Sequence, residues 1–314
     1  MVFVHLAISI GLGARSVLEA EQLGLHQQRL FGPAASDSTV RRLPADFDED
    51  MFAALSRARA AVRRVVWTWL SLRPQGFPWL TVAGKHLQRW VVVDIDATII
   101  TSASKKEGAA PTFKRGFGFH PLAAWCANTQ ECLAMHLRAG NAGSNTAEDH
   151  IAVLTESLHQ IPASSRAKIL VRVDGAGATH DLHEHLQKLN TMRRRVRFTT
   201  VWKITGTDET AIARIPETAW ENSLQQDGSP HDTDHSVVAE PTGLNQREGW
   251  ITGMRLIVRR VRPLRPAPGE PHRLREEDRL EVLGHRHQHH QTVGPPGITP
   301  GLVDRRSAPA PRGR

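Results

Sequence analysis

The chain has 314 residues, a formal net charge of +8 at pH 7 and a sequence pI of about 10.3. A hydrophobic fraction of 40% and eight tryptophans are enough for the core of one large domain or two ordinary ones. Two cysteines exclude a disulfide framework, and the absence of tyrosine excludes an enzyme that uses a tyrosine nucleophile. The positive charge favours polyanionic partners, nucleic acid before an anionic membrane surface.

The first part of the chain has the pattern of helices. Residues 1–30 and a segment introduced by Ser36 and Asp37 read as helical, and residues 48–70 predict a long helix with acids in its first turn. Its arginines would face phosphates or form a solvated basic face; they are Arg57, Arg59, Arg63 and Arg64. Proline and glycine at 74–78 end this region, so we expect a helical N-terminal segment over residues 1–80.

From Trp90 onward the pattern changes to strands alternating with helices. The sequence predicts strands at 90–98, 116–126, 131–138, 167–173 and 195–202, and helices at 146–160 and 179–190. The order β-β-β-α-β-α-β predicts a mixed sheet with helices on its faces, an α/β core over residues 88–202. Residues 203–262 are less regular, end in a strand-like stretch at 254–262, and predict an inserted β-rich subdomain.

The stretch Trp90 to Thr101, WVVVDIDATIIT, carries two charges in an apolar, β-branched run. Strand residues alternate faces, so Asp94 and Asp96 point to the same side. A charge in a buried strand needs a partner or a metal. The pair is therefore one wall of a cation site, or a strand end whose aspartates cap the next turn.

Asp174 follows the fourth strand and gives Asp96 a potential partner. In the predicted order the first and fourth strands are neighbours, which brings Asp96 beside Asp174. Two facing carboxylates repel unless cations lie between them, and hard oxygen ligands suit Mg²⁺ or Mn²⁺. Gly175 and Gly177 would leave room for a backbone or substrate to approach.

Several ordered blocks resemble bacterial insertion-sequence transposases of the DDE class. The blocks are LFGPAASDSTVRRL, DIDATIITSASKKEGAAPTFKRGFGFHPL, LRAGNAGSNTAEDH and ILVRVDGAGATHDL, and the similarity runs from near the N-terminus to about residue 262. The resemblance implies an RNase H-like fold and a metal-dependent enzyme that cuts DNA at the ends of an element and joins them to a target. Asp96 matches the first catalytic aspartate and Asp174 the second, both as ligands of Mg²⁺ or Mn²⁺, while Asp94 is a supporting acid or exchanges roles with Asp96.

The resemblance also implies DNA contacts, an oligomer and a cellular location. Lys105, Lys106, Lys114 and Arg115 flank a loop after the first catalytic strand and would contact phosphates. The run from Arg193 to Arg197 reads as a solvated surface instead. We expect element ends and target DNA as partners, a homo-oligomer as the active form, no membrane, and a cytoplasmic, nucleoid-associated protein.

The third acid of the DDE class, a glutamate on a helix after the β-rich insertion, is not evident. Residues 263–314 are rich in proline, arginine and histidine, and predict a disordered tail whose composition resembles an out-of-frame translation. A short helix at 273–283 is the exception, and Glu276, Glu277 and Glu281 are candidates by location only. The expectation is a transposase shortened at both ends; the alternatives are a catalytically dead DNA-binding protein and a related metal nuclease.

Overall fold

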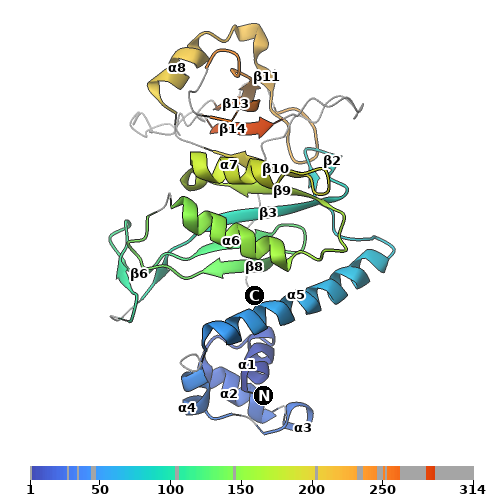
Figure 1. Cartoon of the computed structure of the whole chain (residues 1–314), viewed down its shortest axis with the longest axis vertical. Helices are drawn as coiled ribbons and strands as arrows, with labels where there is room; N and C mark the ends of the chain where they lie inside the picture. The colour runs from blue at the N-terminus through green and yellow to red at the C-terminus, as the bar shows by residue number, and fades with distance from the viewer. Residues whose placement is uncertain are drawn as a thin grey trace, which may run out of the picture. The chain divides into compact units, whose positions relative to one another are not determined.

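A computed structural model of the full chain gives the fold (Figure 1). It describes residues 2–26, 28–33, 35–43, 47–102, 106–143, 146–201, 204–231, 236–245, 250–251, 253–261 and 281–286. The chain forms two compact units, residues 1–62 and 63–314. In the described residues, no helix is long and apolar enough to cross a membrane.

The first unit is helical, as predicted, but residues 1–30 form three helices. The helices are α1 (Val2–Gly11), α2 (Val17–His26), α3 (Gln28–Phe31), α4 (Asp37–Arg42) and the first part of α5 (Glu49–Leu72). Gly13 ends α1 with a φ of +104°, and the next amide, of Ala14, donates to the Ser9 carbonyl at 2.9 Å. This left-handed turn is open to glycine and strained for other residues, which explains the break.

The second unit is built on a five-stranded mixed sheet. Its strands are β3 (Trp90–Ala97), β7 (Leu122–Cys126), β8 (Glu131–His136), β9 (Lys168–Val173) and β10 (Val196–Thr200), in the spatial order β10-β9-β3-β7-β8. β3 pairs with β9 and β9 with β10 in parallel, whereas β3–β7 and β7–β8 are antiparallel. This confirms the predicted β-β-β-α-β-α-β order and the RNase H-like arrangement, with the first and fourth strands adjacent.

Two helices, α6 (Ala147–Gln160) and α7 (His180–Leu189), cover one face of this sheet (Figure 1). Val91, Val93 and Ile95 of β3 point to that face and belong to the same core cluster as Leu154 of α6 and Leu186 of α7. Burying each such side chain contributes about 1.5–3 kcal/mol. On the second face, Trp125 and Met135 are 41% and 53% exposed, so that face is open to solvent there.

The predicted second strand, 116–126, is wrong in its bounds. It is two strands, β6 (Phe117–Phe119) and β7, which belong to different sheets. Pro121 between them has no amide hydrogen to continue a ladder. β6 joins β4 (Ile100–Thr101) and β5 (Ala110–Pro111), the latter inside the predicted loop 102–115, in a three-stranded sheet.

The described residues between 204 and 261 hold one α-helix, one short 3-10 helix and three strands of a second, antiparallel sheet. The elements are α8 (Gly206–Ala213), the short helix η3 (Glu217–Ala219), β11 (Glu221–Asn222), β12 (Ser236–Ala239) and β13 (Met254–Val261). A two-stranded hairpin, β1 (Thr81–Val82) with β2 (Lys85–His86), precedes the core.

One segment of the predicted disordered tail is a strand. β14 (Glu281–Arg286) pairs antiparallel with β13, which corrects both the disorder expected there and the helix at 273–283 for the residues they share. A ladder of six paired residues satisfies backbone groups without needing a core of its own. The rest of 263–314 lies outside the described residues.

Candidate active site

Asp96 lies near the carboxyl end of β3, and Asp174 directly follows the carboxyl end of β9, the parallel strand that pairs with β3. The β3–β9 register pairs Asp94 with Arg172 and Ile95 with Val173, the last residue of β9. Asp96 and Asp174 are the residues that follow this last pair. Both aspartates are exposed. A shared register at the strand ends is the arrangement expected for two acids that serve one site.

Asp94 is engaged by an arginine of the neighbouring strand. The Arg172 guanidinium donates two hydrogen bonds to the Asp94 carboxylate, with Nε–Oδ1 and Nη2–Oδ2 distances of 2.5 and 2.7 Å. Bidentate pairs of this kind are strong and fix both groups. The geometry therefore favours Asp96 over Asp94 as the metal ligand and makes Asp94 the partner of Arg172.

In the turn after Asp174, Gly177 packs closely against Val173 and the buried His150. Asp174 is followed by the short helix η2 (Gly175–Gly177), in which a Cβ at Gly177 would lie 1.9 Å from Val173 Cγ1 and 3.3 Å from His150 Cδ2. His150 is buried, with its Nδ1 2.8 Å from the Thr146 carbonyl oxygen. Gly177 thus serves close packing on β9 itself, rather than the approach of a substrate.

The donor set fits a divalent cation of the hard, oxygen-preferring kind. Asp96 and Asp174 offer carboxylate oxygens from adjacent strands, which suit Mg²⁺ or Mn²⁺ with water in the remaining positions. In the part of the chain that the structure describes, no group of three or more His, Cys, Asp or Glu side chains is arranged to hold a metal. The candidate metal site therefore consists of two carboxylates, those of Asp96 and Asp174.

The structure does not identify the third acid of the DDE class. Glu276 and Glu277 lie outside the described residues, and Glu281 begins β14.

The described DNA-contacting candidates lie in the connections of the three-stranded sheet, Lys106 between β4 and β5, and Lys114 and Arg115 in the β5–β6 hairpin. Lys106, Lys114 and Arg115 are exposed between β4 and β6, and Lys105 lies outside the described residues. The Arg115 amide donates to the Thr112 carbonyl at 3.0 Å, and Arg115 has a φ of +61° at the tip. Lys114 and Arg115 are thus presented to solvent on this tight turn, and Lys106 is exposed in the preceding connection.

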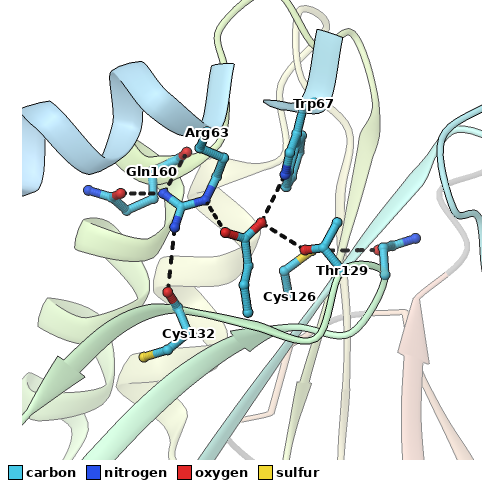
Figure 2. Close-up of polar contacts among 8 residues, drawn as sticks. Arg63, Trp67, Cys126, Thr129, Cys132 and Gln160 are labelled. Atoms are coloured by element: carbon cyan, nitrogen blue, oxygen red, sulfur yellow. Dashed lines mark hydrogen bonds and ion pairs between the residues drawn. The ribbon is translucent and has the colours of Figure 1, made fainter. Parts of the chain in front are cut away.

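Arg63, expected on a phosphate-facing or solvated surface, is buried in a polar network (Figure 2). Its Nε donates to Glu131 at 2.8 Å, its Nη1 donates to the Gln160 side chain, and Trp67 Nε1 donates to the same Glu131 at 2.8 Å. Burial would raise the pKa of Glu131, but hydrogen bonds from Thr129, Trp67 and Arg63 outweigh it and hold that pKa below its ordinary value. The network joins the second half of α5 to β8 and α6.

Asp149, in the first turn of α6, is part of an internal ion pair. Arg138, which is 5% exposed, donates to Asp149 at 3.0 Å and to the His120 carbonyl at 3.0 Å. This pair ties the end of β8 to the first turn of α6. The sequence does not show it, because helix and strand periodicity do not say which charged residues turn inward.

Comparisons with known proteins give a family and distant structural likenesses. The sequence model described as "Transposase DDE domain group 1" matches residues 17–267. No curated protein sequence matches the chain significantly.

Three solved structures illustrate the distant likenesses. A piggyBac transposase synaptic complex with hairpin DNA has 10% identity and a TM-score of 0.36, covering 65% of this chain and 34% of that one. A Mos1 transposase paired-end complex with left transposon end has 12% identity and a TM-score of 0.24, covering 62% and 57%. Endonuclease V of Ciona intestinalis, in complex with inosine-containing DNA, has 11% identity and a TM-score of 0.27, covering 77% and 84%. The chain thus spans less than two thirds of the length of the two transposases.

Proposed function

The chain belongs to the transposase family with a DDE domain of group 1, and from this we propose that it cuts and joins DNA strands in the transposition of an insertion sequence. The observation that supports the proposal is the β3–β9 register, because Asp96 and Asp174 follow its last pair, Ile95 with Val173. Two carboxylates at the ends of neighbouring strands can hold a divalent cation, and phosphodiester chemistry uses such cations.

Each residue of the site has a role in this proposal. Asp96 and Asp174 hold Mg²⁺ or Mn²⁺, which when bound polarises the scissile phosphate and lowers the pKa of an attacking water. Arg172 fixes Asp94 and offsets one negative charge beside the pair. The exposed cations Lys106, Lys114 and Arg115 position the DNA backbone. The element ends and the target are the DNA partners, and the acting form is a homo-oligomer.

A second function, DNA binding without cleavage, is favoured by one observation. The described residues contain no group of three acids, histidines or cysteines arranged for a metal, whereas the DDE class takes its name from three acids. A protein that kept the basic surfaces and lost the third acid would bind DNA and leave it intact.

A cleavage assay separates these functions. Purified full-length protein is incubated with Mn²⁺ and DNA that carries the element ends, beside the variants Asp96→Asn and Asp174→Asn. Nicking that falls at least about 100-fold in both variants supports the proposal. The exposed Asp181→Asn, on α7, is the matched control and keeps wild-type nicking.

The remaining outcomes contradict the proposal. Wild-type binding without nicking supports the DNA-binding alternative. Cleavage that shows no preference for the element ends and no strand joining supports a metal nuclease unrelated to transposition.

A further inference from the structure

Four basic residues gather around Trp90 at the amino ends of β3, β9 and β10. Lys168 Nζ lies 5.2 Å and Arg197 Cζ 5.8 Å from the centre of the Trp90 ring. The Arg195 carbonyl accepts from the Ile169 amide, and the Arg89 carbonyl accepts from the Lys168 amide, both at 2.8 Å. We call Arg89, Lys168, Arg195 and Arg197 the Trp90 cluster.

The Trp90 ring and its two cations share a sheet face with Asp94 and Asp96. Trp90 pairs with Lys168 and Asp94 with Arg172 in the β3–β9 register. The two pairs are separated by an even number of residues along each strand. Since side chains alternate, Trp90, Asp94 and Asp96 point to one side. The contact of Arg197 with the Trp90 ring brings β10 into the same surface. Six residue-to-residue steps along the strand lead from Trp90 to Asp96, about 20 Å at ~3.3 Å per step.

The cluster concentrates like charge. Among the described residues, no carboxylate forms an ion pair with Arg89, Lys168 or Arg195. Burial, and then the charges of Arg195, Arg197 and Arg89, lower the pKa of Lys168. Burial and the charge of Arg195 lower that of Arg197. Such mutual repulsion is unfavourable in the isolated protein and is relieved by a bound polyanion.

We propose that the Trp90 cluster binds the phosphate backbone of the double-stranded DNA whose cleaved phosphate lies at Asp96 and Asp174. The inference deepens the proposed function and rests on it. A surface that begins about 20 Å from the acid pair corresponds to about six base pairs at 3.4 Å per step. The cluster therefore holds the duplex away from the position of chemistry, in addition to the hairpin that carries Lys114 and Arg115.

Equilibrium binding tests the proposal in full-length protein carrying Asp96→Asn, which keeps the DNA intact. Binding to a 30-base-pair duplex, a length of about three turns, is followed by fluorescence anisotropy over a range of salt concentrations. The test variant adds Lys168→Gln, Arg195→Gln and Arg197→Gln. The matched control adds Lys85→Gln, Lys188→Gln and Arg214→Gln, three exposed cations elsewhere with the same change of net charge.

The test variant is expected to bind about 10- to 100-fold more weakly at 0.1 M salt, with a salt slope smaller by about two to three, because each phosphate contact contributes about 0.9 to the slope. The control stays within about threefold of the parent. Equal affinity of test variant and parent overturns the proposal. An equal loss in test and control variants also overturns it, since net charge alone would then set the affinity.

Folding and the proposed function are controlled separately. The melting temperature of the test variant is expected to match or exceed that of the parent, because repulsion is removed. If the test variant fails to fold, Arg195→Gln alone, at an exposed side chain, is expected to lower the salt slope by about one, and an unchanged slope overturns the proposal. The two proposals can fail independently. If only the test variant loses DNA binding, and the wild-type protein does not cleave DNA, the result supports the Trp90 cluster and contradicts the cleavage function.

Discussion

Arg172 on β9 holds Asp94 on β3 by two hydrogen bonds, at 2.5 and 2.7 Å, and each of these residues lies two positions before one of the aspartates proposed for the metal, Asp174 and Asp96. The two aspartates of β3 thus have different surroundings although they lie on one face of one strand. The charge of Asp94 is offset by Arg172 on the neighbouring strand, and Asp96 lies exposed near the end of β3. The first prediction follows from this contrast.

Replacing Arg172 by leucine leaves the half-buried Asp94 carboxylate without its bidentate partner. We expect the free energy of unfolding to fall by about 1–3 kcal/mol, the usual range for a lost hydrogen bond to a charged group. Urea unfolding measures it. The double variant Asp94→Asn, Arg172→Leu should recover part of the loss, and additive losses would show that the pair is not coupled.

The acid pair predicts stabilisation by metal. At Mg²⁺ ten times its dissociation constant, binding to the folded state alone adds about 1.4 kcal/mol, which raises the melting temperature by about 3–6 °C in a chain of this size. The rise should disappear in Asp96→Asn and Asp174→Asn and persist in Asp181→Asn. A wild-type melting temperature that does not respond to Mg²⁺ or Mn²⁺ would count against the two-aspartate site.

The Arg63 network should be a major source of stability for the second unit. Glu131→Ala leaves the Arg63 guanidinium, which is 6% exposed, without its carboxylate, and we expect a loss of about 3–5 kcal/mol in urea unfolding. The neighbouring Arg64 is exposed, so Arg64→Ala should change stability by less than about 0.5 kcal/mol. Similar effects of the two substitutions would refute the assigned burial of Arg63.

The pKa of Glu131 gives the same network a pH dependence. Because the folded-state pKa lies below the ordinary 4.5, the stability from this group is present above pH 4.5 and is lost as the pH falls through the folded value. Unfolding measurements in this acid range should show a steeper loss in wild type than in Glu131→Gln, which cannot ionise.

His183 predicts a second pH dependence, at higher pH. Its ring stacks on Phe198 with centroids 5.1 Å apart, neither ring nitrogen has a hydrogen-bond partner among the described residues, and burial followed by the charge of His180 lowers its pKa from 6.5 to about 4. The unfolded state therefore takes up a proton before the folded state does. Stability should be full above pH 6.5 and fall by up to about 1.4 kcal/mol per unit between pH 6.5 and 4.

Urea unfolding from pH 4 to 7.5 measures this dependence. His183→Leu removes the buried ring nitrogens and should flatten the curve, while the exposed His159→Gln should keep the wild-type slope. Parallel curves for wild type and His183→Leu would rule out His183 as the source.

Local patterns in the sequence were enough for the scaffold of the candidate site. The β-branched stretch Val91–Ile95 predicted a strand, strand alternation placed Asp94 and Asp96 on one face, and the order of elements made β3 and β9 neighbours. These properties depend on residues close in the chain and on general rules of chain connection. The DDE family was visible for the same reason, because its blocks are contiguous.

Long-range contacts could not be predicted from these local sequence patterns. The sequence did not show that Arg172 pairs with Asp94, that Arg63 turns inward to Glu131, or that Arg197 lies over Trp90. Whether a given arginine is solvated, paired or gathered with others depends on which strand and helix lie across from it. Such contacts join residues 68 to 107 positions apart.

The sequence by itself therefore determined the fold class, the family and the two aspartates proposed for the metal, since each rests on short-range pattern. Only the tertiary structure decided which charges are balanced within the protein and which face outward. The physical reason is that a charge is stabilised by whatever lies within a few ångströms of it, and in this chain those neighbours come from distant segments.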